Sequence, residues 1–95
     1  MVEEFSEQHG DALISIIEMV LIRRGNTKYN LLVAKLSSRY DCTVRDCYGH
    51  PEYLRTILKE VYKEDYNSII GEIKLQLDEL VKEKDIVDFF KIMAS

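Results

Sequence analysis

Three side chains that could bind a metal, or act as a nucleophile and its base, lie together in mid-sequence: Cys42, Cys47 and His50. Zinc takes four ligands in a tetrahedron, so His9 or a carboxylate would have to supply the fourth. The chain has only two cysteines, so no second cysteine pair completes such a site. A Cys47–His50 nucleophile–base pair would need this segment to be helical, which Pro51 disfavours. We interpret the cysteines as structural thiols, with metal binding and a Cys42–Cys47 disulfide as alternatives, and we predict no cofactor.

Catalytic signatures are missing from the sequence. None of the motifs G-x-G-x-x-G, G-x4-G-K-[ST], H-E-x-x-H and G-x-S-x-G occurs. Carboxylates such as Glu60, Glu64 and Asp65 fall on expected helix ends or wet faces, where a charged side chain is ordinarily solvated. We therefore predict that the protein is not an enzyme.

The charge is unevenly distributed along the sequence, although the net charge is only -4. Residues 1–21 contain five acidic and no basic side chains, residues 22–63 contain nine basic and four acidic, and residues 64–95 contain four basic and eight acidic. A basic segment interleaved with tyrosines suits nucleic acid, but a pI of about 5.1 is atypical of nucleic-acid binders. We favour a solvated or intramolecularly paired basic face, and nucleic-acid binding is the alternative. Its candidate contacts are Arg23, Arg24, Lys28, Lys35 and Arg39.

Apolar residues recur at steps of three and four along most of the chain, which is the period of amphipathic α-helices. We predict an all-α protein, a compact bundle of four to five helices in a single domain, with residues 1–10 as a flexible leader and residues 11–95 as the helical domain. A separate fifth helix is favoured over a bent continuation of the fourth. The helices are expected from Asp11 to about Arg24, from Lys28 to about Tyr40, from Pro51 to near Tyr62, from Asp65 to Val81, and around Ile86 to Met93.

Local signals define several of the expected boundaries. Gly25 should end the first helix, and Pro51 suits the first turn of the third. Thr43 and Asp46 have the spacing of a capping box, which predicts a short helical turn. Gly71 weakens the fourth helix, so we expect another helix to approach closely there.

The longest apolar run, Ala12 to Ile22, is interrupted by Ser15 and Glu18 and is too short to span a bilayer. The sequence begins Met-Val-Glu-Glu-Phe, whereas a secretory signal begins with basic residues. We expect a cytoplasmic protein with no membrane partner.

Excess apolar surface is the main functional clue in the sequence. The first helix is apolar around more than one face, and an uncovered apolar patch indicates a partner protein or a homodimer. The alternative is that all of this surface packs inside one bundle. The predicted anchors of an interface are Ile14, Ile17, Leu21, Phe89 and Phe90.

The expected helices follow one another in a recognisable order. An apolar first helix ends in a glycine turn and is followed by a tyrosine-containing helix, a short linker with a proline, and two amphipathic helices. The residues of this pattern are Tyr29, Leu32, Lys35, Leu36, Arg39, Tyr40, Pro51, Leu54, Ile57, Leu58, and the stripe from Ile69 to Leu80. Over about residues 11–81 the pattern resembles a small archaeal helical family, the nitrosopumilus output domain 5 family. The resemblance implies a stand-alone regulatory or signal-output module and supplies no catalytic residues.

Overall fold

The computed structural model describes the backbone of residues 2–94 and the side chains of residues 9–94. Within that range every regular element is a helix, which confirms the all-α prediction. The described elements are α1 (Val2–Arg23), α2 (Asn26–Tyr40), η1 (Arg45–Tyr48), α3 (Pro51–Tyr62), η2 (Lys63–Asp65), α4 (Tyr66–Leu77), η3 (Asp78–Lys82) and α5 (Lys84–Ala94), where η marks a short 3-10 helix.

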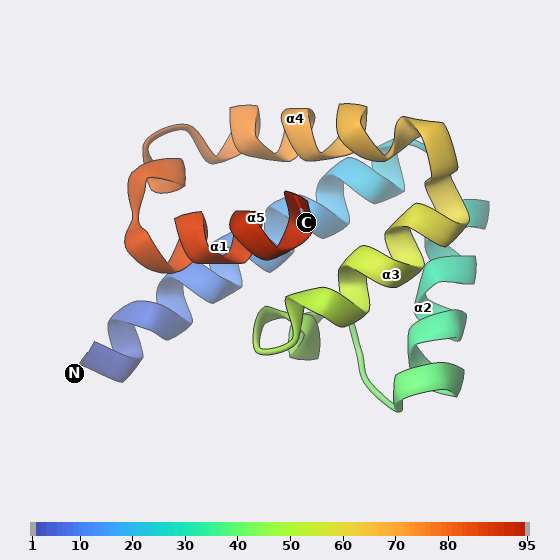
Figure 1. Ribbon diagram of the computed structural model, residues 1–95, viewed down its shortest axis with the longest axis horizontal. Helices are drawn as coiled ribbons and strands as arrows, with labels where there is room; N and C mark the ends of the chain where they lie inside the picture. The colour runs from blue at the N-terminus through green and yellow to red at the C-terminus, as the bar shows by residue number, and fades with distance from the viewer. Residues whose placement is uncertain (1, 95) are drawn as a thin grey trace.

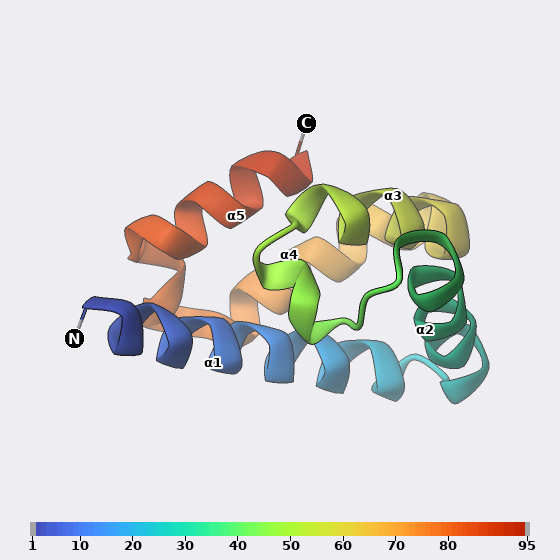
Figure 2. The same cartoon turned by 90° about the horizontal axis from the view of Figure 1, so that it is seen from below.

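Helix α1 is the spine of the bundle. Its 22 residues give a rod of about 33 Å at 1.5 Å per residue, close to the longest dimension of the molecule, 36 Å. Helices α2, α4 and α5 all pack on α1, and α3 packs on α2 and α5. Figures 1 and 2 show α2 closing one end of the bundle, with α3 and α5 on the side opposite α1.

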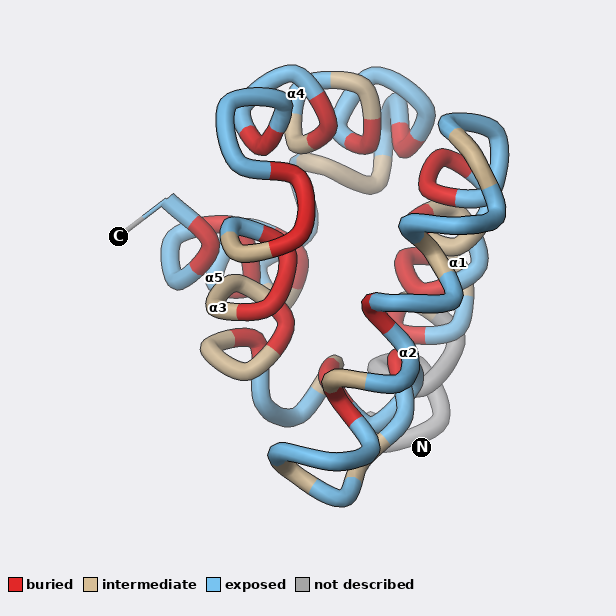
Figure 3. The backbone as a smooth tube through the Cα atoms, turned by 90° about the vertical axis from the view of Figure 1, so that its right-hand side faces the viewer, coloured by how far each residue is buried: buried red, intermediate tan, exposed pale blue. Residues whose placement is uncertain are grey.

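The core consists of hydrophobic side chains, with Cys47, Tyr62 and Tyr66 among them, and no other polar or charged side chain among the described residues is buried. In Figure 3 the buried turns of α1, α3, α4 and α5 face the space enclosed by the helices. The predicted stripe is confirmed within α4, since Ile69, Ile73 and Leu77 are buried. The predicted end of this helix at Val81 is wrong, because α4 ends at Leu77 and η3 follows. The largest fully buried side chains are Leu13, Ile14, Ile17, Leu21, Leu32, Leu36, Leu54, Ile57, Leu58, Ile69, Ile73 and Ile86.

The predicted capping box at Thr43 is confirmed. The Thr43 N–H donates to a carboxylate oxygen of Asp46 at 3.0 Å, and the Asp46 N–H donates to the Thr43 hydroxyl at 3.3 Å. This reciprocal pair begins η1, which leads to Pro51 at the start of α3. The boundary signals at Gly25 and Pro51 are likewise confirmed.

The separate fifth helix is confirmed. Helix α4 ends at Leu77, η3 follows, and Glu83 is extended (φ -70°, ψ 139°) before α5 begins at Lys84. Helix α5 therefore turns back along the molecule instead of extending α4 (Figure 1).

The predicted start of the first helix at Asp11 is wrong, because α1 begins at Val2. Gly10 lies inside the helix, and its missing side chain makes room for Tyr48: an added Cβ would come within 2.9 Å of the Tyr48 ring. The glycine is thus a packing position and not a helix break. The predicted flexible leader covers residues 1–10. The side chains of residues 1–8 lie outside the described range, so the flexibility of this segment stays a prediction.

The expected close approach at Gly71 is also wrong. Gly71 is exposed in mid-α4, and no heavy atom of a neighbouring element lies within 4 Å of an added Cβ. The chain therefore accepts the lower helix propensity of glycine, about 1 kcal/mol relative to alanine, without an internal packing reason.

No helix of the described chain combines the length and the apolar character needed to cross a membrane.

The two glycines yield a paired stability prediction. Gly71→Ala should raise the free energy of unfolding by about 1 kcal/mol, because alanine gains helix propensity and meets no neighbour. Gly10→Ala should lower it, because the new methyl group collides with the Tyr48 ring. Urea denaturation followed by circular dichroism measures both changes, and a stabilised Gly10→Ala protein would contradict the packing role of Gly10.

Candidate functional site

The five predicted interface anchors lie in the core of the single chain. Ile14, Ile17 and Leu21 are 0–1% exposed, Phe89 is 3% exposed and Phe90 is 6% exposed. The prediction that these residues form an exposed interface is therefore corrected. The reason is tertiary: three helices cover α1, so its wide apolar face is buried within one chain.

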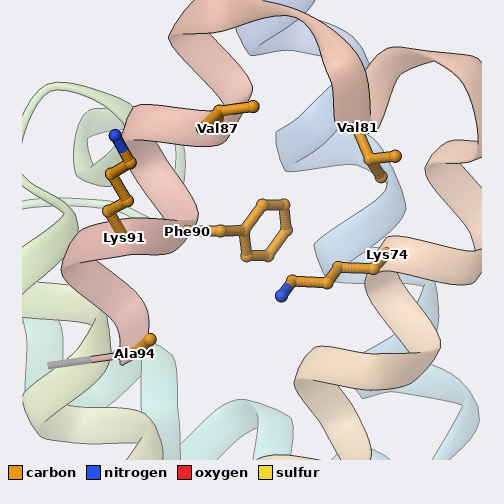
Figure 4. Close-up of a pocket in the computed structure, with 6 residues that line it drawn as sticks. All are labelled: Lys74, Val81, Val87, Phe90, Lys91 and Ala94. Carbon is orange, nitrogen blue, oxygen red and sulfur yellow. The ribbon is translucent and has the colours of Figure 1, made fainter.

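An open apolar groove lies between α4 and α5. It consists of two adjacent hollows of about 420 and 320 Å³, which share Lys74 and Ala94 in their linings. Figure 4 shows the larger hollow, with Phe90 pointing from α5 toward α4. We call this surface the α4/α5 groove. It is lined by Lys59, Tyr66, Asn67, Ile70, Gly71, Lys74, Val81, Val87, Phe90, Lys91, Met93 and Ala94.

Hydrogen bonding and chain connection hold the groove together at its two ends. The Tyr66 hydroxyl on α4 donates to the carbonyl of Met93 on α5 at 2.6 Å. At the other end η3 joins the two helices covalently. Burial raises the pKa of Tyr66 to about 12, which keeps its hydroxyl protonated as the donor.

Two lysines in the groove lie over aromatic rings. The Lys74 ammonium is 5.2 Å from the centre of the Phe90 ring, and the Lys59 ammonium is 5.3 Å from the centre of the Tyr66 ring. A cation at this distance from a ring face is attracted by its quadrupole. The groove therefore combines an apolar floor with positive charge.

The basic residues at the end of α1 are engaged by α4. Arg24 donates to a carboxylate oxygen of Glu72 at 2.8 Å and to the Ser68 hydroxyl at 3.1 Å. Arg23 approaches the other oxygen of Glu72 at 4.0 Å. Two of the five candidate nucleic-acid contacts are thus matched by one carboxylate of the same chain.

The basic residues of α2 are engaged by α3. Glu60 accepts from Lys35 at 3.0 Å and from Arg39 at 2.5 Å. These hydrogen bonds, with that of Arg39 the stronger, lower the pKa of Glu60 from 4.5 to about 2. The Lys28 ammonium lies 5.6 Å from the centre of the Tyr62 ring. The arrangement fits an intramolecularly paired basic face.

The cysteine–histidine segment does not assemble as a metal centre. The sulfur atoms of Cys42 and Cys47 are 3.9 Å apart and unbonded, and the Cys47 thiol donates to the Thr43 carbonyl. The His50 ring stacks on Tyr53, with centroids 4.7 Å apart. Among the described residues, no three His, Cys, Asp or Glu side chains are grouped closely enough to hold a metal ion.

A polar cluster that was not predicted from the sequence joins α1, η1 and α5. His9 Nδ1 lies 3.1 Å from both carboxylate oxygens of Asp85, and the Tyr48 hydroxyl donates to Asp85 at 2.7 Å. Burial acts to raise the pKa of Asp85, but these hydrogen bonds outweigh it and the pKa is lowered. Because His9 and Tyr48 both bond to Asp85, the cluster clamps the start of α5 to α1 and η1. No local signal could reveal it, since His9 and Asp85 are 76 positions apart.

The Glu60 contacts predict a pH-dependent contribution to stability. The pKa of Glu60 is lower in the folded chain than in the unfolded one, so its ionised form stabilises the fold above about pH 4.5, and this contribution is lost as the pH falls toward about 2. Glu60→Gln should unfold at lower urea concentration than the wild type at neutral pH, and the difference should vanish near pH 2. Glu64→Gln is the matched control on η2. An equal and pH-independent effect of both substitutions would contradict the ion-pair explanation.

Burial also predicts different reactivity of the two thiols. Cys47 is fully buried and burial raises the pKa of its thiol, whereas Cys42 is partly exposed. In the native protein a thiol reagent should modify Cys42 at least about tenfold faster than Cys47. The fast phase should therefore persist in Cys47→Ala and disappear in Cys42→Ala. Equal rates for the two cysteines would show that Cys47 is accessible in solution.

Comparison of the chain with family models, with curated proteins and with solved structures finds no match. The resemblance to the nitrosopumilus output domain 5 family accordingly stays a prediction from the order of hydrophobic segments. The α4/α5 groove is a hollowed surface lined by aromatic and aliphatic side chains as well as lysines.

Proposed function

We propose that this chain is a non-enzymatic helical interaction module that binds a partner protein, or a second copy of itself, through the α4/α5 groove. The observation that carries the proposal is the apolar groove that the fold leaves open beside Phe90 (Figure 4). Concave apolar surfaces of this kind bind side chains that a partner would otherwise expose to water.

The chemistry of the lining supports binding rather than catalysis. Its ionisable side chains are three lysines and one tyrosine, and no carboxylate, histidine or thiol lines the groove. General acid–base catalysis ordinarily uses a group that titrates near neutral pH, in reach of the reacting atoms. The His9–Asp85–Tyr48 cluster satisfies its own hydrogen bonds away from the groove lining.

The wider role is part of the same proposal. A regulatory, signal-output-like function is what the resemblance of residues 11–81 to an archaeal family of such modules implies, and we propose a cytoplasmic location with it. The pairing of Arg24 with Glu72, and of Arg39 with Glu60, favours a protein partner over nucleic acid, since it neutralises much of the positive charge that phosphates would need.

Two exposed residues of α5 allow a matched test. Val87 lines the groove and is 36% exposed, whereas Ile92 is 37% exposed and is not part of the lining. In capture from an extract of the source cell, Val87→Asp should lose the partner that the wild type retains, because a carboxylate is costly to bury in an apolar contact. Ile92→Asp should retain it.

Nuclease treatment of the same extract separates the two classes of partner. A protein that is captured equally with and without nuclease, and lost only in Val87→Asp, supports the proposal. A complex that disappears with nuclease would instead support the nucleic-acid alternative. Equal capture by Val87→Asp and the wild type would refute the use of the groove.

A further inference from the structure

The charge of the α4/α5 groove is opposite to that of the chain as a whole. The net charge is -4, yet the lining contains Lys59, Lys74 and Lys91 and no acidic residue. A local field of this sign attracts carboxylates and repels basic partners. The groove therefore selects by charge as well as by apolar contact.

Lys74 and Lys91 of the groove differ from Arg24 and Arg39 in their partners. Arg24 and Arg39 are held by carboxylates of neighbouring helices. Among described side chains, neither Lys74 nor Lys91 forms an ion pair, and Lys74 lies over the Phe90 ring. The ammonium groups of Lys74 and Lys91, beside the apolar floor of the groove, can therefore pair with a carboxylate of another molecule.

Gly71 indicates the shape of that molecule. It lines the smaller hollow beside Ile70, and its missing side chain leaves open space on the groove-facing surface of α4. Helices approach one another more closely where the side chain at the contact is small. An approaching backbone, and not only a single side chain, can therefore fit against this wall.

We propose that the α4/α5 groove binds an amphipathic helix of a partner protein whose apolar residues are flanked by Asp or Glu. The two hollows would receive apolar side chains of this helix, and the flanking carboxylates would pair with Lys74 and Lys91. This inference rests on the proposed function and deepens it by specifying the chemistry of the partner.

The test uses the full chain and a labelled synthetic probe. The probe is a fluorescein-labelled amphipathic peptide with Phe and Leu one turn apart and glutamates at the flanking positions. One control peptide carries lysine in place of every glutamate, and a second carries alanine in place of Phe and Leu. Fluorescence anisotropy should detect binding of the acidic apolar peptide and much weaker binding of both controls.

Variants of the chain test each feature of the groove. Lys74→Glu with Lys91→Glu should weaken binding of the acidic peptide at least about tenfold, whereas the matched Lys82→Glu on η3 should leave it within about twofold. Gly71→Leu should fold, since nothing lies within 4 Å of its Cβ, and should block binding by filling the wall. Retained binding in Gly71→Leu would refute the helix-docking geometry.

Other outcomes identify a different occupant and overturn the inference. Equal binding of the basic peptide would remove the charge argument. A wild-type dimer in light scattering that Lys74→Glu converts to a monomer would assign the groove to a second copy. If the protein bound phosphatidylglycerol vesicles and did not bind the peptide, the groove would be assigned to a membrane surface.

The failure of this inference is distinguishable from that of the proposed function. If the acidic peptide does not bind but Val87→Asp still loses a protein that Ile92→Asp captures, only the chemistry of the partner is wrong. If neither the peptide nor a Val87-dependent partner is found, both proposals fail.

Discussion

The burial of α1 is the constraint on which the rest of the structure depends. This helix presents apolar side chains over more than half of its circumference, and Ile14, Ile17 and Leu21 must all be removed from water. One neighbouring helix cannot cover such a surface, so α2, α4 and α5 each take part of it. Because α4 and α5 pack on α1 rather than along each other, a groove remains between them. The covering of α1 and the opening beside Phe90 are therefore two results of the same packing.

Ion pairs within the chain determine which basic side chains have a carboxylate partner. Glu60 holds Lys35 and Arg39, and Glu72 holds Arg24, so the acidic residues of α3 and α4 neutralise the basic segment that precedes them. These exposed pairs contribute little to stability individually. They contrast with Lys74 and Lys91 of the α4/α5 groove, neither of which forms an ion pair among the described side chains.

The helices were predictable from the sequence because periodicity and capping are local properties. The Thr43–Asp46 capping box, the start of α3 at Pro51 and the separate α5 all follow from neighbouring residues. The site was not predictable in this way. The sequence predicts Phe90 as a surface anchor, but the tertiary structure covers most of its side chain. The two glycines have opposite packing environments, because Gly10 faces the Tyr48 ring and Gly71 faces open space. The contact of His9 with Asp85 is equally invisible, since it joins the two ends of the chain.

The groove has the properties of a preformed site. Its walls are tied at one end by the Tyr66–Met93 hydrogen bond and at the other by η3, and the clamp of Asp85 to Tyr48 and His9 fixes the start of α5 on the spine. A binding surface whose walls are already ordered loses little conformational entropy when a partner docks. Gly71 acts against this order, because it lowers the helix propensity of one wall, and other contacts hold that wall in place. Gly71 weakens its own helix and touches no neighbouring element of its chain. A contact with another molecule at this position would explain why glycine occurs there.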